Sequence, residues 1–140
     1  MKTKPNYWYN QSAVIPYRII DNKIEILIIT SRKKKHWIIP KGIIEKNLSS
    51  LESAQKEALE EAGVIGNGNE SIIGKYKYKK WGGKCKVTVF SMEVKSYSDI
   101  WVEDFRERKW IGYEKVDKYI NNKKLLKIIN KFFKLQKNFI

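Results

Sequence analysis

The sequence is poor in the residues that build covalently cross-linked or membrane-spanning structures. Cys85 is the single cysteine among 140 residues, which excludes an internal disulfide and fits a reducing compartment. No run of about 18 uninterrupted apolar residues occurs, and Met1 to Gln11 lack the apolar run of about 7–15 residues that a secretory signal needs. These absences predict a soluble, cytoplasmic protein without a membrane partner.

Arginine is also scarce, although the chain is strongly basic. The formal net charge is +14, and nearly all of the positive charge is lysine, because Arg18, Arg32, Arg106 and Arg108 are the only arginines. Such a charge fits nucleic acid, an anionic membrane surface or a polyanionic small substrate, and biased codon usage could also produce it. Arginine is the better residue for bidentate phosphate contacts, so we expect no stable nucleic-acid partner.

Length and apolar content predict a single domain over residues 1–140. A chain of this length can bury a sizeable core without disulfide or metal staples. Hydrophobic residues make up 42% of the sequence, and Trp37, Trp101 and Trp110 are spread along it, unlike in a disordered chain.

The first half of the chain predicts a β-hairpin. Residues 13–20 and 23–30 are β-rich, and Asp21 and Asn22 between them are residue types that tight hairpin turns favour. Residues 24–29 begin to be apolar on both faces, which is typical of a strand that is covered on both sides. We therefore expect a sheet that lies between helices.

A second pair of strands and two helices are expected after the centre of the chain. Strands at residues 71–80 and 84–95 flank the turn-forming Gly82-Gly83, and the alternating pattern around Cys85 predicts a core cysteine. Residues 113–120 predict a short helix. Residues 123–139 predict a longer one with a lysine-rich outer face, for which we favour core packing over membrane or nucleic-acid binding, through Leu125, Ile128, Ile129, Phe132 and Phe133.

The central helix has clear start and stop signals. Ser49 and Glu52 have the spacing of a capping box, which satisfies two otherwise unpaired amide donors, and Gly63 supplies the matching stop. Between them an apolar stripe recurs at three- and four-residue steps, so this face can lie against the sheet; it consists of Leu51, Ala54, Ala58 and Ala62.

The same helix carries a crowded group of carboxylates. Glu57, Glu60 and Glu61 stand three and four residues apart and gather on a neighbouring face, with Lys56 to offset their repulsion. Such a group is either a solvated acidic face or a site for a divalent cation.

Its sequence context favours the second reading. Residues 42–64 resemble the Nudix box, G-x5-E-x7-R-E-U-x-E-E-x-G-U, where U is aliphatic; the matching positions are Gly42, Glu57, Ala58, Glu60, Glu61, Gly63 and Val64. Lys56 stands where the family has arginine, and Leu48 where it has its first glutamate. In the family this pair braces the loop and helix. Either Leu48 anchors the loop by burial, or Glu45 is a substitute carboxylate, or the enzyme is weakened or inactive.

The resemblance extends beyond the box to roughly residues 13–120. Thr30-Ser31-Arg32 and Trp37 to Gly42 look like the T-S-R and W-x-x-P-K-G segments of Nudix (MutT-like) hydrolases that act on diphosphoinositol polyphosphates and diadenosine polyphosphates. The later residues that resemble the diphosphoinositol branch are Trp101, Glu103, Arg106, Arg108 and Trp110.

The resemblance implies an α/β protein with the Nudix fold, an α/β/α sandwich in which a mixed β-sheet lies between helices. It implies a metal-dependent hydrolase that cleaves a diphosphate bond in a small phosphorylated substrate: a nucleoside-diphosphate-linked compound, a dinucleoside polyphosphate or a diphosphoinositol-like compound, with capped RNA as a further possible substrate. The alternative is a non-catalytic Nudix-fold protein that binds polyphosphate or nucleic acid through its lysines.

Residue roles follow from the same resemblance. Glu57, Glu60 and Glu61 would hold Mg²⁺ or Mn²⁺, with the Gly42 carbonyl completing the shell. One of these box glutamates, or Glu103, would take the proton from the attacking water. For substrate phosphates the candidate ligands are Arg18, Arg32 and Lys41.

Overall fold

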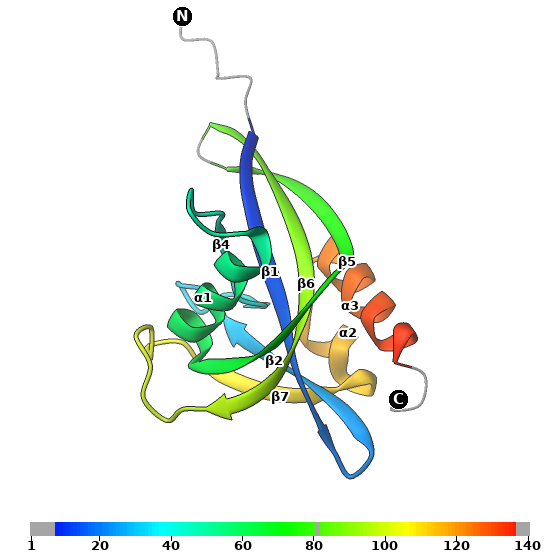
Figure 1. Cartoon of the computed structure of the whole chain (residues 1–140). Coiled ribbons are helices and arrows are strands. Elements are labelled where there is room, and N and C mark those ends of the chain that lie inside the picture. Colours follow the sequence, from blue (N-terminus) through cyan, green and yellow to red (C-terminus); the bar gives the residue numbers. More distant parts are fainter. Residues whose placement is uncertain (1–7, 81, 137–140) are drawn as a thin grey trace, which may run out of the picture.

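The computed structural model describes residues 8–80 and 82–136. A seven-stranded sheet lies between one helix on one face and two helices on the other (Figure 1). The elements in chain order are β1 (Trp8–Ile20), β2 (Lys23–Thr30), β3 (Trp37–Ile38), β4 (Lys41–Ile43), α1 (Ser50–Ala62), β5 (Val64–Lys80), β6 (Gly83–Tyr97), β7 (Arg108–Gly112), the 3-10 turn η1 (Tyr113–Lys115), α2 (Val116–Tyr119) and α3 (Lys123–Leu135). This arrangement is the α/β/α sandwich that the sequence predicts.

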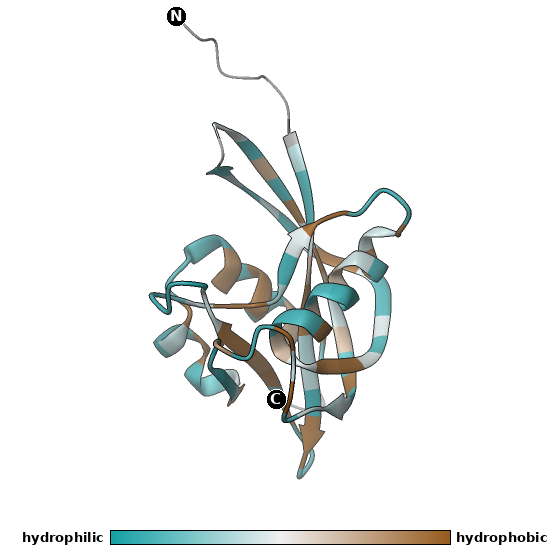
Figure 2. Ribbon diagram, turned by 90° about the vertical axis from the view of Figure 1, so that its left-hand side faces the viewer, coloured by the Kyte–Doolittle hydropathy of each residue, from teal (hydrophilic) through white to brown (hydrophobic). Residues whose placement is uncertain are grey.

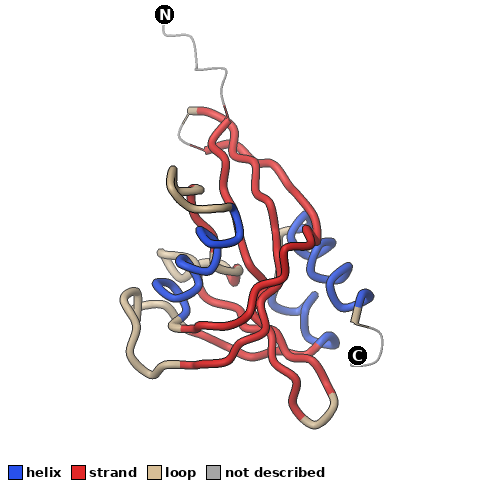
Figure 3. Tube along the Cα trace, in the orientation of Figure 1, coloured by secondary structure: helices blue, strands red, loops and turns tan. Residues whose placement is uncertain are grey.

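The sheet is mixed. Its main path is β3-β2-β1-β6-β5, while β4 pairs with β1 and β7 pairs with β2. Strands β1 and β6 are parallel, and the other pairs are antiparallel. Strands dominate the tube view in Figure 3, and β5 is the outer strand on the side of α3. One edge of the sheet is therefore the long strand β5.

The predicted hairpin is confirmed. Asp21 and Asn22 have φ angles of 50° and 64°, and Asx residues tolerate this left-handed region better than other non-glycine residues do. Both turn residues with positive φ give the twist that suits the flanking strands, and the register pairs Ile20 with Lys23. Strand β1 begins at Trp8, earlier than the sequence predicts, because its first part pairs with β6.

Strand β5 is also longer than predicted. It begins at Val64, directly after the end of α1, and includes Gly66, Asn67, Gly68 and Asn69, which look like loop residues in the sequence. Pairing with β6 holds this part extended, with irregularities in the register after Ile65 and Asn69. A side chain at Gly66 would collide with the backbone of β6, so the glycine is required by close approach of the two strands.

Each face of the sheet has its own apolar core. The face under α2 and α3 is filled by large residues, among them Ile15, Ile26, Phe132 and Phe133. The face under α1 buries small helix residues against Val14, Leu27 and Met92; these are Ala54, Ala58 and Ala62. Figure 2 shows the alternation of apolar and polar residues along the helices. The small side chains allow α1 to lie close to the sheet.

The residues that the sequence predicts to be buried in the last helix are buried in the structure. The five core residues expected on α3 are buried, and Cys85 is buried in β6. The described part of α3 ends at Leu135, and Phe139 lies outside the described residues. The segment predicted as one short helix is a 3-10 turn followed by α2. Among the described residues, no helix is long and apolar enough to cross a bilayer.

Candidate active site

Helix α1 begins at the capping box that the sequence predicts. The Ser49 hydroxyl accepts a hydrogen bond from the Glu52 amide at 3.1 Å, and the Ser49 amide donates to the Glu52 carboxylate at 2.9 Å. At the other end Gly63 has a φ of 68°, and its amide donates to the carbonyl of Leu59. Both ends of the acidic helix are therefore fixed by local contacts.

The segment between β6 and β7 seals the C-terminal end of α1, a contact that the sequence did not predict. The Glu103 amide donates to the Glu60 carbonyl at 2.9 Å, the Trp101 indole to the Glu61 carbonyl at 3.0 Å, and the Arg108 guanidinium to the Ala62 carbonyl at 2.9 Å. These carbonyls have no partner within the helix. Their satisfaction fixes the segment and places Glu103 beside the acidic helix.

Arg108 is a structural residue of this junction. Its guanidinium also donates to the Ser98 carbonyl at 2.8 Å, and it lies between the rings of Tyr97 and Trp101, at 3.9 and 3.7 Å from their centroids. Cationic, planar guanidinium groups stack well on aromatic faces. With its donors used on carbonyls and its faces covered by rings, Arg108 holds the segment onto α1.

Glu57 and Glu61 form the centre of the site. Their carboxyl groups share a hydrogen bond, and Glu61 is 7% exposed. The Glu57 carboxyl packs against the backbone of Gly42, where an added Cβ would lie 2.5 Å from its Oε1 atom. The Lys41 amide donates to Oε1 of Glu61 at 3.3 Å. The glycine of the box is thus needed to let α1 bring its carboxylates against β4.

The environment of this pair disfavours two negative charges. Burial, and next the neighbouring Glu57 carboxyl, raise the pKa of Glu61 to about 9, although Arg106 opposes the rise. Burial also raises the pKa of Glu57, as do the charges of Glu60 and Glu103. Without a cation, one proton shared by the half-buried Glu57 and the buried Glu61 is therefore the favoured state of the pair.

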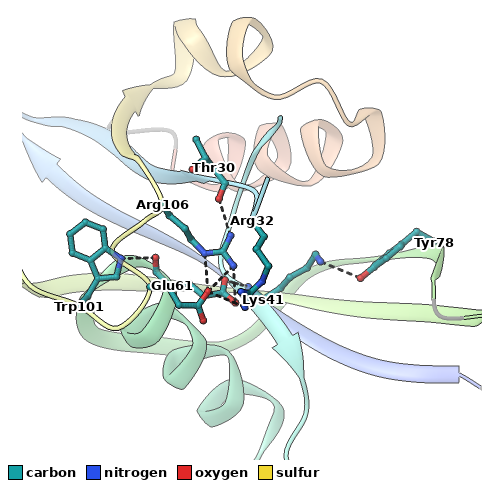
Figure 4. Close-up of polar contacts among 8 residues, drawn as sticks. Thr30, Arg32, Lys41, Glu61, Tyr78, Trp101 and Arg106 are labelled. Atoms are coloured by element: carbon teal, nitrogen blue, oxygen red, sulfur yellow. Dashed lines mark hydrogen bonds and ion pairs between the residues drawn. The ribbon is translucent and has the colours of Figure 1, made fainter. Parts of the chain in front are cut away.

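Arg106 is a buried cation beside the two carboxyls, and Figure 4 shows it between Thr30 and Glu61. It donates to the Thr30 carbonyl at 2.9 Å and to Oε1 of Glu103 at 2.9 and 3.1 Å, and it lies 4.0 Å from Oε2 of Glu61. The guanidinium therefore ties the end of β2 to Glu103. The sequence did not show that Arg106 is buried between these groups, because Thr30 and Glu61 are far from it along the chain.

The two departures from the box pattern are connected by one ion pair. Lys56 lies 2.8 Å from a carboxylate oxygen of Glu45, and it also lies 3.9 Å from Glu60. The Glu45 amide donates to the Ser53 hydroxyl at 3.0 Å, while Leu48 is partly buried. Of the alternatives left open by the sequence, Glu45 is the substitute carboxylate that joins the loop to the helix.

The three basic candidates lie in different places. The Arg32 guanidinium is exposed and lies 3.6 Å from Glu103, at the edge of the site. The Lys41 ammonium points away from Glu61 toward the Tyr78 hydroxyl, at 3.2 Å, and burial lowers the pKa of Lys41. Arg18 is paired with Glu25 at 2.7 Å and stacks on Trp110. Its described ion pair and ring contact therefore do not involve Glu57 or Glu61.

The donor set fits a hard divalent cation. Carboxylate and carbonyl oxygens are the ligands that Mg²⁺ and Mn²⁺ prefer. Two carboxyls that share one proton provide these oxygens, and a cation would remove the repulsion between them. Within residues 8–80 and 82–136 no three acidic, histidine or cysteine side chains stand together as a preformed metal cluster. Glu60 is instead turned to Lys56, and Glu103 to Arg106.

Comparisons with known proteins agree with this geometry. The NUDIX domain model matches residues 9–133. Nudix hydrolase 13, mitochondrial, of Arabidopsis thaliana is 35% identical over 124 residues, covering 72% of this chain and 61% of the relative. The asymmetrical bis(5'-nucleosyl)-tetraphosphatase of Sus scrofa is 35% identical over 104 residues, covering 68% of this chain and 69% of that protein.

A solved structure extends the likeness to the fold. The Ap4A hydrolase of C. elegans superposes with a TM-score of 0.79 at 20% identity, covering 93% of this chain and 99% of that one. The chain spans about 60% of the length of the plant relatives that it matches. The match over most of the chain, together with the acidic helix that packs against Gly42, leads to one conclusion: this chain is a member of the Nudix family.

Proposed function

We propose that this chain is a metal-dependent hydrolase that cleaves a phosphoanhydride bond in a dinucleoside polyphosphate. The observation that carries the proposal is the pair of carboxyls against Gly42, the half-buried Glu57 and the buried Glu61. Two such carboxyls that repel each other are costly, and a bound divalent cation removes this cost. Relatives that are named for dinucleoside tetraphosphates support this substrate class.

Each residue of the site has a role in this proposal. Glu57 and Glu61, with Glu60 and the Gly42 carbonyl, would hold Mg²⁺ or Mn²⁺. When bound, the cation would neutralise phosphate charge and lower the pKa of a water molecule. Water adds to one phosphorus atom as the bridging oxygen leaves with the other, and Glu103 accepts the proton from that water. Arg106 orients Glu103 through two short hydrogen bonds.

The basic side chains act on the substrate in the same scheme. The exposed Arg32 guanidinium, beside Glu103, contacts a phosphate near the reacting bond. Lys41 contacts a more distant part of the substrate, because its ammonium lies on the side of Tyr78. Arg18 would first have to leave Glu25, so its contribution is the smallest of the three.

The test is release of nucleotide or phosphate from a panel: dinucleoside polyphosphates, diphosphoinositol polyphosphates, nucleoside triphosphates and capped RNA. Each is incubated with Mg²⁺, with Mn²⁺ and with chelator. We expect turnover of dinucleoside polyphosphates that chelator abolishes and Glu103→Gln slows on the order of 10²–10⁴-fold. Faster turnover of diphosphoinositol polyphosphates than of dinucleoside polyphosphates would overturn the proposed substrate class and replace it by diphosphoinositol polyphosphates. Binding without turnover would replace it by a non-catalytic binding protein.

The same proposal includes a cytoplasmic location and one domain over residues 1–140. The relatives include proteins whose names place them in mitochondria or chloroplasts. A fluorescent fusion of the whole protein in cells of its source, viewed beside organelle markers, tests the location.

A further inference from the structure

A groove of about 920 Å³ lies between α3 and the edge strand β5. Its floor is apolar and includes Ile73, Leu126 and Ile128. Helix α3 lies on the side of the sheet opposite α1 (Figure 1), and none of the site carboxylates lines the groove. None of the residues that the proposed hydrolysis uses lines this groove.

The rim of this groove carries seven lysines and no acidic residue. Five are on α3, and the others, Lys75 and Lys77, are on β5. Successive lysines three or four residues apart on α3 lie within the screening length of about 8–10 Å in physiological salt, so they repel one another. An anionic partner would convert this repulsion into attraction.

The lysines of α3 form a row. Lys124, Lys127, Lys131 and Lys134 follow one another at steps of three and four residues, so they lie along one side of the helix and are exposed. With a helical rise of about 1.5 Å per residue, the steps are about 4.5–6 Å and the row is about 15 Å long. An extended chain of phosphates can contact successive members of such a row.

A second groove continues this surface around the edge of the sheet. It has a volume of about 450 Å³ and lies beside the loop that precedes α1, with Lys46 and Lys86 in its lining. Lys75 lines both grooves. Glu45 also lines the second groove but is paired with Lys56. Lysines therefore follow a bent path, here called the lysine track, from the box loop across β5 to α3.

Contrary to the expectation from the scarcity of arginine, we propose that the lysine track binds the phosphodiester backbone of single-stranded nucleic acid, RNA or DNA, without sequence preference. A length of connected basic surface suits a polymer better than a compact phosphate. The bend at Lys75 suits a flexible single strand, because duplex DNA has a persistence length of about 50 nm and resists such curvature. Lysine acts as a point charge and not as a bidentate ligand, which suits contacts to backbone phosphates.

Two other polyanionic partners suit the track less well. A membrane surface would need several exposed apolar side chains beside the lysines for insertion, but Phe132 and Phe133 face the core, and among the described residues of α3 Leu135 is the one large apolar side chain that is exposed. An acidic peptide added to the edge of β5 would need the free backbone groups of that strand, and the Lys124 ammonium already donates to the Lys77 carbonyl at 2.7 Å. Nucleic acid requires neither.

The experiment measures binding of the whole protein to a fluorescent 20-nucleotide RNA of mixed sequence, in chelator, over a series of salt concentrations. The variant Lys127→Gln/Lys131→Gln/Lys134→Gln removes three charges of the row. The matched control Lys23→Gln/Lys115→Gln/Lys118→Gln removes three exposed lysines that do not line either groove. Thermal unfolding and hydrolysis of the small substrate are measured for both variants and should be unchanged.

We expect the row variant to raise Kd at least about tenfold and to reduce the slope of log Kobs against log salt by about 2, while the control changes neither. Single-stranded DNA of the same sequence should bind similarly, and a four-nucleotide RNA and a duplex much more weakly. Equal weakening by the control variant would overturn the proposal. So would equal affinity for the four-nucleotide RNA, or preference for phosphatidylserine vesicles or polyglutamate.

Discussion

The two long helices cover opposite faces of one sheet and are held there by different forces. Both have 13 residues. Helix α1 buries alanines and the polar Glu61, and side chains or loop amides bind both of its ends. Helix α3 buries leucine, isoleucine and phenylalanine and carries lysines on its outer face. Close-packed apolar side chains hold α3 on the sheet, whereas at α1 directional hydrogen bonds also fix where the carboxylates lie.

The largest expected effect breaks the packing of α3. Phe132 is fully buried and lies against the rings of Tyr17 and Phe133. Phe132→Ala should lower the free energy of unfolding by about 3–5 kcal/mol, measured by urea denaturation, because it leaves a cavity. The kcat per folded molecule should not change. The neighbouring exposed Lys131→Gln is the control, and a loss no larger than in that control would contradict the role given to α3.

The next effect is on the chemistry of α1. Glu57→Gln should lower kcat with Mg²⁺ on the order of 10²–10³-fold, equivalent to about 2.7–4 kcal/mol of transition-state stabilisation, because a charged ligand is lost. Thermal unfolding in chelator should show no loss of stability. Glu52→Gln, on the same helix but in the capping box, should keep its kcat. Full activity of Glu57→Gln would remove Glu57 from the site.

The junction between α1 and the segment before β7 gives a smaller effect. Arg108→Ala should lower the free energy of unfolding by about 1.5–3 kcal/mol, because the carbonyls of Ala62 and Ser98 lose a charged donor. The kcat should fall as well, since Glu103 is carried by the same segment. Lys109→Ala, one residue away, is the control in denaturation and kinetics. Loss of stability without loss of kcat would separate the junction from the site.

The pH dependence of stability in chelator sharpens the contrast between the helices. The pKa of Glu61 is raised to about 9 in the folded protein from an ordinary value near 4.5. The folded state therefore binds more protons between these values, and its stability falls as the pH rises from about 4.5 to 9. Glu61→Gln should flatten this part of the Tm-against-pH curve and give a higher Tm than the wild type at pH 8. Equal slopes would show that the pair is not coupled in solution.

The smallest effect concerns the departure at Leu48. Leu48→Glu restores the glutamate of the family pattern, but Lys56 is already paired with Glu45. Neither kcat nor Tm should change much, whereas Glu45→Gln/Leu48→Glu should behave like the wild type because the pairing moves to the new carboxylate. A large gain in kcat from Leu48→Glu alone would show that Glu45 is a poor substitute.

The local signals in the sequence predicted the helix and hairpin well. Ser49, Glu52 and Gly63 gave the ends of α1, because capping depends on residues that are adjacent along the chain. Asp21 and Asn22 gave the turn between β1 and β2 for the same reason. The acidic cluster was predicted from helical spacing, although Glu60 is turned to Lys56 and only Glu57 and Glu61 share a hydrogen bond.

Long-range contacts were not predictable in this way. The start of β5 contains Gly66 and Gly68, which look like a loop until β6 is placed beside them. Strand β7 was not expected, because its pairing partner β2 is about half the chain away. The bonds from Arg106 to Thr30 and from Trp101 to Glu61 join residues 76 and 40 positions apart, and no local pattern encodes them.

The sealing of α1 by a later part of the chain has a consequence for biosynthesis. A ribosome completes the acidic helix well before it adds Trp101, Glu103 and Arg108, whose donors bind the last carbonyls of that helix. Until then these carbonyls have only water or chaperone surface as partners, and the helix end frays. The nascent chain therefore completes the set of donors that fixes this end of the acidic helix only after residue 108 has left the exit tunnel.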